Sequence, residues 1–90
     1  MALQYVGTGR IGTQQSVGYT ASAGTVTNGV STGVTKVRVL CTTDAFVSTD
    51  GTDSAYVPAL SPEYFTVTPG QHVSATQVSA GGTLYVNEIW

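Results

Sequence analysis

The clearest strand signal in the chain is TKVRVLCTT, residues 35–43. Two sets of residues alternate along it: Val37, Val39 and Cys41 in one set, Lys36, Arg38 and Leu40 in the other. Successive side chains of a β-strand point to opposite faces. The first set is therefore predicted to face a core, and the second set is predicted to lie on the opposite face with its charged groups pointing outward. Cys41 falls in phase with the two valines, which favours a buried, inert thiol over a reactive one.

Working outward from this strand, turn signals divide the rest of the chain into short apolar runs. Asp50-Gly51 and Gly81-Gly82 are typical of tight hairpins, Pro58 ends or restricts a strand to a sheet edge, and Pro69-Gly70 is a strong turn signal. The predicted strands between them are AFVS, SAYVPAL, EYFTVT, QHVSATQVS and TLYVNEIW. Strands at this spacing predict an all-β protein, a small antiparallel, jelly-roll-like β-sandwich or barrel of about seven to nine short strands.

The first third of the chain differs from the rest in composition and in the spacing of its apolar residues. In residues 1–33, glycines recur every few residues among Thr, Ser and Gln, and apolar residues are scattered. This predicts either short strands broken by turns or an extended arm that a partner must order. The whole chain, residues 1–90, is too short for a second core and is predicted to be one domain.

Composition supports strands and narrows the possible partners. Thirteen valines and fifteen threonines favour strands, because β-branched side chains pack well on a pleated surface. Charged residues are only 9% of the chain against about 25% in ordinary soluble domains, which suits either a surface shared with other subunits or a secreted domain. Three basic residues form no stripe for phosphates, which argues against nucleic acid as a partner.

Two further features bear on location. No apolar run approaches the roughly 20 residues that cross a bilayer, and the N-terminus lacks a basic segment followed by an apolar one, so neither membrane anchoring nor export is expected. A single cysteine allows no intrachain disulfide. We therefore expect the protein to be made in a reducing cytoplasm.

Candidate site residues are few, and each has a structural alternative. His72 could act as a general base, but no nucleophile motif accompanies it and a surface role is favoured. The acidic group of Asp44, Asp50, Asp53 and Glu63 has oxygen ligands suited to calcium but does not match a calcium-loop pattern. Asx hydrogen bonds in a hairpin turn are the favoured role of Asp50 and Asp53.

The remaining candidates carry weaker signals. GTGRIG, residues 7–12, superficially resembles a phosphate-binding loop but lacks the strand before it and the helix after it. Five tyrosines with Phe46, Phe65 and Trp90 could stack on sugars or bases, although core and interface positions are the favoured reading. No catalytic, cofactor-binding or metal-binding residue is predicted, and neither is a cofactor.

From Lys36 to the end, the order of motifs resembles small proteins encoded among the virion genes of tailed bacteriophages. The motifs are VRVLCTTDAFV, then YVPALSPEYFTVTPGQHV, then SAGGTLYVNEIW. The resemblance covers roughly the last 55 residues and leaves out the N-terminal third. It implies a phage particle component, such as a capsid decoration (cement) protein or a head-fibre-base protein, and it implies no active site.

The expected function is therefore a non-enzymatic one. We expect an oligomeric decoration protein on the exterior of the head, whose partners are the major capsid protein or another virion protein and copies of itself. The resemblance implies a homotrimer, since decoration proteins in that group often sit at local three-fold positions. The alternative is a tail- or head-fibre-associated module that binds a carbohydrate or receptor through exposed tyrosines and the Asp-rich loop.

Overall fold

The computed structural model of the protein describes residues 10–90 and consists there of strands, turns and bends. The strands are β1 (Ile11–Tyr19), β2 (Gly24–Thr25), β3 (Lys36–Cys41), β4 (Ala45–Ser48), β5 (Ser54–Val57), β6 (Glu63–Thr66), β7 (Ser74–Gln77) and β8 (Gly82–Ile89). No helix in this described part of the chain is long and apolar enough to cross a membrane. The all-β prediction is confirmed.

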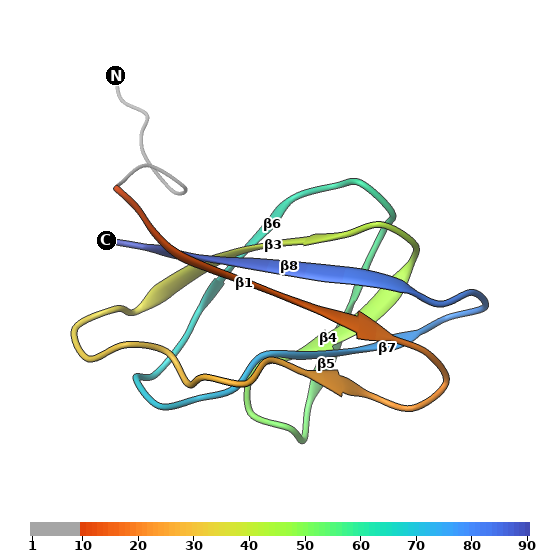
Figure 1. The fold of residues 1–90 in the computed structure, drawn as a ribbon, viewed down its shortest axis with the longest axis horizontal. Coiled ribbons are helices and arrows are strands. Elements are labelled where there is room, and N and C mark those ends of the chain that lie inside the picture. Colours follow the sequence, from red (N-terminus) through yellow and green to blue (C-terminus); the bar gives the residue numbers. More distant parts are fainter. Residues whose placement is uncertain (1–9) are drawn as a thin grey trace.

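The eight strands form two four-stranded antiparallel sheets packed face to face (Figure 1). The strand order is β1-β8-β3-β6 in one sheet and β2-β7-β4-β5 in the other. Strands that follow each other in sequence therefore mostly lie in different sheets, which is the winding of a jelly roll, also called a double-stranded β-helix. The predicted sandwich is confirmed in class, layers and strand number.

One part of the topology prediction is wrong. Tight hairpins were predicted at Asp50-Gly51 and at Gly81-Gly82. Within the described residues, however, β4 and β5 are the only consecutive strands that pair with each other. At Gly81-Gly82 the chain crosses between sheets, because β7 pairs with β4 and β8 returns between β1 and β3. A Cβ at Gly82 would come within 2.5–2.8 Å of the hydroxyls of Thr42, Thr43 and Tyr19. This glycine permits a close approach rather than a hairpin turn.

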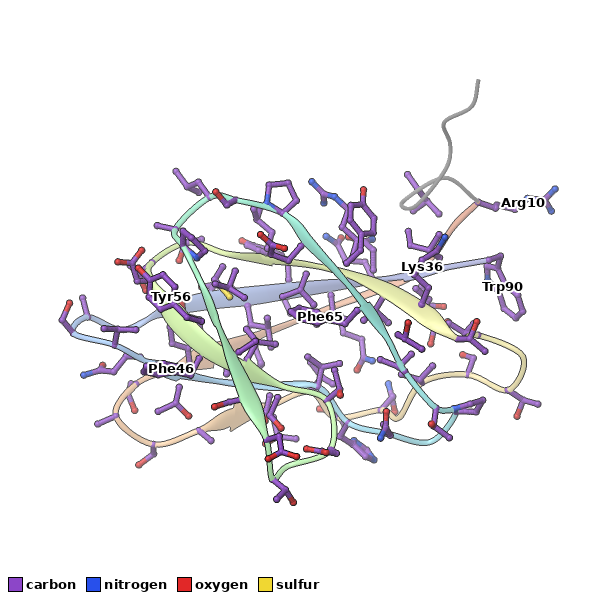
Figure 2. The ribbon with its side chains drawn as sticks, turned by 180° about the vertical axis from the view of Figure 1, so that it is seen from behind. Arg10, Lys36, Phe46, Tyr56, Phe65 and Trp90 are labelled. Atoms are coloured by element: carbon purple, nitrogen blue, oxygen red, sulfur yellow. The ribbon has the colours of Figure 1, made fainter. Side chains whose placement is uncertain are left out.

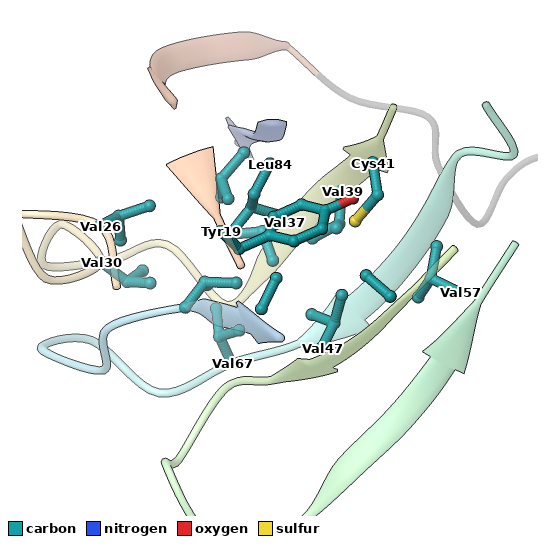
Figure 3. Packing of buried hydrophobic residues seen from close by; sticks show 14 of the residues in the cluster. Tyr19, Val26, Val30, Val37, Val39, Cys41, Val47, Val57, Val67 and Leu84 are labelled. Atoms are coloured by element: carbon teal, nitrogen blue, oxygen red, sulfur yellow. The ribbon is translucent and has the colours of Figure 1, made fainter. Parts of the chain in front are cut away.

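The core lies between the two sheets and is built largely from valine (Figure 3). Val37, Val39 and Cys41 are all 0% exposed, whereas Lys36 and Arg38 lie on the other face of β3, as the alternation predicts. The remaining core residues are Tyr19, Val26, Val30, Val34, Ala45, Val47, Val57, Val67, Val73, Ala75, Leu84 and Val86. Phe65 faces the core but is only partly buried, because its strand β6 is at the sheet edge.

The glycine-rich stretch contributes directly to this sandwich. β1 pairs with β8 from Ile11 to Tyr19, with a register shift between Ile11 and Gln14. Tyr19, Val26 and Val30 are buried. Residues 10–33 thus form a nine-residue strand, β1, a two-residue strand, β2, and turns within the fold, so the predicted short strands are replaced in part by one long strand. Residues 1–9, including part of the 7–12 motif, lie outside the described residues.

Candidate functional site

One candidate site is a groove at one end of the β2-β7-β4-β5 sheet. Its volume is about 360 Å³. Its lining comes from the β4–β5 loop, from the connection between β6 and β7, and from the strands β2 and β7. The residues that line it are Thr25, Thr49, Asp50, Gly51, Gly70, Gln71, His72 and Ser74. The groove therefore joins two residues singled out in the sequence, Asp50 and His72.

Asp50 organises the loop wall of the groove. Its Oδ1 accepts hydrogen bonds from the backbone N–H of Thr52 at 2.8 Å and of Asp53 at 3.0 Å, and from the Ser48 hydroxyl at 3.2 Å. Gly51 follows with a φ of 81°, a conformation that favours glycine. The predicted Asx turn is confirmed for the side chain of Asp50. Asp53 takes part in this turn through its backbone N–H, which donates to Oδ1 of Asp50, and not through its carboxylate.

These hydrogen bonds make the loop sensitive to acid. The N–H groups of Thr52 and then Asp53 stabilise the charged carboxylate and lower the pKa of Asp50 below its ordinary value of 3.8. Because the folded pKa is the lower one, the stabilisation is complete above 3.8 and is lost as the pH falls through the folded pKa. We expect the protection of the Thr52 and Asp53 amides from hydrogen exchange, measured by NMR relative to the intrinsic rate at each pH, to fall in that acidic window. The Asp50→Asn variant should lack this pH dependence, and an unchanged profile would contradict the turn's role.

His72 is fixed in the groove by the backbone. Its Nδ1 lies 3.0 Å from the carbonyl oxygen of Val26. A carbonyl only accepts, so Nδ1 carries the proton, and in the neutral imidazole the lone pair is then on Nε2. The ring is thus oriented by a carbonyl, and the Oδ1 of Asp50 is engaged in its own turn. The two residues share a groove without forming a hydrogen-bonded acid–base pair.

Gln71 is a groove residue that sequence reasoning missed. Its side-chain Oε1 accepts a hydrogen bond from the backbone N–H of Thr68 at 2.9 Å, and its backbone N–H donates to the carbonyl oxygen of Thr68 at 3.1 Å. These bonds close the Pro69-Gly70 turn, where Gly70 has a φ of 92°. The turn was predicted from Pro69-Gly70, but no pattern indicated that the following glutamine would lock it.

The other acidic candidates lie elsewhere. Asp44 lies just before β4, where its Oδ1 accepts the backbone N–H of Ala59 at 2.8 Å, and a hydrogen bond to Asp44 raises the pKa of the Tyr56 phenol. Glu63 begins β6 in the opposite sheet. Within residues 10–90, no group of three or more His, Cys, Asp or Glu side chains is placed to hold a metal ion. Cys41 is buried, and this burial raises its pKa.

Glu88 was also missed by sequence reasoning. It is 4% exposed, and its Oε2 accepts both the N–H and the hydroxyl of Ser31 at 2.9 Å. Its Oε1 has no hydrogen-bond partner among the described residues. The period-two pattern of β8 places position 88 on the inner face, but a carboxylate there is unexpected because burial of a charge is costly.

A second surface feature is an aromatic patch, which we define as Phe46, Tyr56 and Val78. Phe46 and Tyr56 are cross-strand partners on β4 and β5, with ring centroids 6.1 Å apart in an edge-to-face arrangement. Their side chains are 43% and 52% exposed, and they lie at the opposite end of the molecule from Trp90 (Figure 2). Val78, 43% exposed, follows β7, and its N–H donates to the carbonyl of Asp44 just before β4.

Comparisons with known proteins bear on the fold alone. No protein-family model and no curated protein matches the chain. Among solved structures, it is similar to a de novo designed double-stranded β-helix determined by solution NMR, with a TM-score of 0.62 and 15% sequence identity. The match covers 84% of this chain and 97% of the designed one. A likeness at this identity supports the β-helix winding and says nothing about function.

Proposed function

We propose that this chain is a non-enzymatic structural protein of a bacteriophage particle, a homo-oligomeric decoration protein on the outside of the head. The observation that carries the proposal is the aromatic patch. Large apolar side chains exposed side by side on a rigid sheet are typical of surfaces that bind other proteins. Its partners would be the major capsid protein and other copies of the chain.

The charge distribution supports a shared surface. The chain has only eight charged residues, and Glu88, one of them, is buried. Exposed Ile11 and Leu60, at 75% and 68%, add to the apolar area outside the patch. Interface cores are depleted in charge and enriched in aromatic residues, so this surface suits burial against neighbouring subunits.

The resemblance to phage virion proteins supplies the biological setting. Phe46 lies in the motif VRVLCTTDAFV, and Tyr56 begins the motif YVPALSPEYFTVTPGQHV. Both aromatic rings of the patch therefore belong to the segment that resembles the virion proteins. The trimer follows from the same resemblance, and a closed ring of identical chains leaves no unpaired heterologous surface. The protein would be made in the host cytoplasm and end on the virion surface.

Replacing Phe46 by serine tests the patch. We expect the variant to fold and to bind heads of the phage that encodes the chain at least about tenfold more weakly, because an exposed aromatic anchor is lost. Co-sedimentation with purified heads measures binding, and light scattering after gel filtration measures the oligomer. Tyr64→Ser is the matched control, since Tyr64 is 38% exposed on β6 of the other sheet. Equal head binding by both variants and the unmodified protein would contradict the proposal.

A further inference from the structure

The groove between the β4–β5 loop and the β6–β7 connection holds three side chains that are each fixed through only one of their polar atoms. Asp50 is held through Oδ1, His72 through Nδ1 and Gln71 through Oε1. No hydrogen bond within the described residues engages Oδ2 of Asp50, Nε2 of His72 or Nε2 of Gln71. The fold therefore orients these side chains and leaves one polar atom of each available.

The available atoms define what the groove can recognise. Oδ2 of Asp50 accepts hydrogen bonds, Nε2 of His72 accepts one when the imidazole is neutral, and the amide Nε2 of Gln71 donates two. Thr25, Thr49 and Ser74 add hydroxyls that do both. A ligand that suits this set carries several O–H groups that both donate and accept, with two of them close enough to reach one carboxylate.

The lining residues disfavour an anion and a metal ion as the ligand. The lining contains one carboxylate and no Lys or Arg, which disfavours an anion. Asp50 and His72 are fewer than the three protein ligands of a typical zinc site, and within residues 10–90 no group of three or more His, Cys, Asp or Glu side chains is placed to hold a metal ion. Threonine methyls and the backbone of Gly51 and Gly70 give carbon surface beside the polar atoms. A sugar ring presents this same mixture of C–H and O–H groups.

We infer that this groove binds a neutral hexose, with Asp50 accepting hydrogen bonds from two adjacent hydroxyls and with His72 and Gln71 holding neighbouring positions. The groove, at about 360 Å³, has room for one ring. This site is separate from the aromatic patch, so it stands independently of the proposed decoration role. It would let the protein contact a glycan while other surfaces engage its neighbours.

The affinity should be low, because the groove offers no aromatic ring for stacking among its lining residues. A ligand of hexose size that relies on a few hydrogen bonds is expected to bind with a Kd of about 1–10 mM. The experiment titrates the full isotope-labelled chain with methyl α-mannoside, methyl α-glucoside and methyl α-galactoside. Amide chemical shifts of Thr49, Gly51, Gln71 and His72 report binding. We expect saturable shifts at these positions with at least one of the three.

Asp50→Asn is the decisive variant, since an asparagine Oδ1 can keep the Asx turn while the second carboxylate oxygen is lost. We expect its Kd to rise at least about tenfold, equivalent to 1.4 kcal/mol. Asp53→Asn is the matched control: it removes the same charge from the same loop, outside the groove lining, and should leave the Kd unchanged. His72→Ala is a second variant that leaves the loop intact and should also weaken binding.

Three results would overturn the inference. One is the absence of saturable shifts with all three hexosides up to about 50 mM, well above the expected Kd. Another is equal weakening by Asp50→Asn and Asp53→Asn, which would indicate a general charge effect. The third is saturation by lysine amide alone, which would make the groove an acceptor for a cationic side chain. Head binding measured with the same variants tests the decoration role separately.

Discussion

The Leu84→Ala variant should lose about 2–5 kcal/mol of unfolding free energy. Leu84 lies on β8, is 0% exposed, and stands in register between Val17 on β1 and Cys41 on β3. Removing its branched end leaves a cavity bounded by three strands whose backbones are fixed by sheet hydrogen bonds, so relaxation around it is restricted. Urea unfolding of wild type and variant, followed by tryptophan fluorescence or circular dichroism, measures the loss.

Leu60→Ala is the matched control for this prediction. Leu60 is 68% exposed in the β5–β6 connection, so the same change there should alter the unfolding free energy by no more than about 0.5 kcal/mol. A domain of this size is stabilised by about 5–15 kcal/mol, so the core variant should lose a large share of the total. Similar losses in both variants would contradict a core centred on β8.

The inward and outward faces of the strands could be predicted from the sequence because period-two alternation is a local property. Val37, Val39 and Cys41 are buried as predicted, and Thr66 is exposed beside inward-facing Phe65. The extent of burial could not be predicted, since it depends on a strand's place in its sheet. A fully buried Phe65 would cost about 3–5 kcal/mol on truncation to alanine, and its edge position lowers that expectation.

The winding of the strands could not be predicted, because a turn signal shows that the chain reverses and not which sheet it enters next. Asp50-Gly51 does join paired strands, whereas Pro69-Gly70 and Gly81-Gly82 join strands of different sheets. The two kinds of connection use the same residue types. Long-range pairing decides between them, and a single sequence does not reveal it.

The candidate groove was only partly predictable for a related reason. The Asx turn of Asp50 depends on residues within three positions, so the sequence indicates it. The proximity of His72 to that turn depends on how β4 and β7 pair, which is a long-range property. Glu88 shows a further limit, since its partner Ser31 is distant in sequence and a buried carboxylate contradicts ordinary polarity patterns.

The glycine-rich N-terminal stretch has a packing role that the second large prediction tests. Gly24 begins β2, and a Cβ there would collide with the backbone carbonyl of Gly18 and lie 3.3 Å from the Cα of Tyr19. Both obstacles are main-chain atoms of β1 itself, so no side chain can move aside. The Gly24→Ala variant should therefore push β2 away from β1 and lose about 2–3 kcal/mol of unfolding free energy.

Gly18→Ala separates this crowding from a general intolerance of alanine in the stretch. A Cβ at Gly18 would have its nearest neighbour, the carbonyl oxygen of Gly82, at 3.8 Å, which is ordinary van der Waals contact. That variant should change stability by no more than about 0.5 kcal/mol. Denaturant midpoints of the two variants, compared at equal slope, measure the difference. A Gly24→Ala protein as stable as Gly18→Ala would mean that β2 is not held against β1, and the glycines would then reflect turn formation rather than close packing of the two sheets.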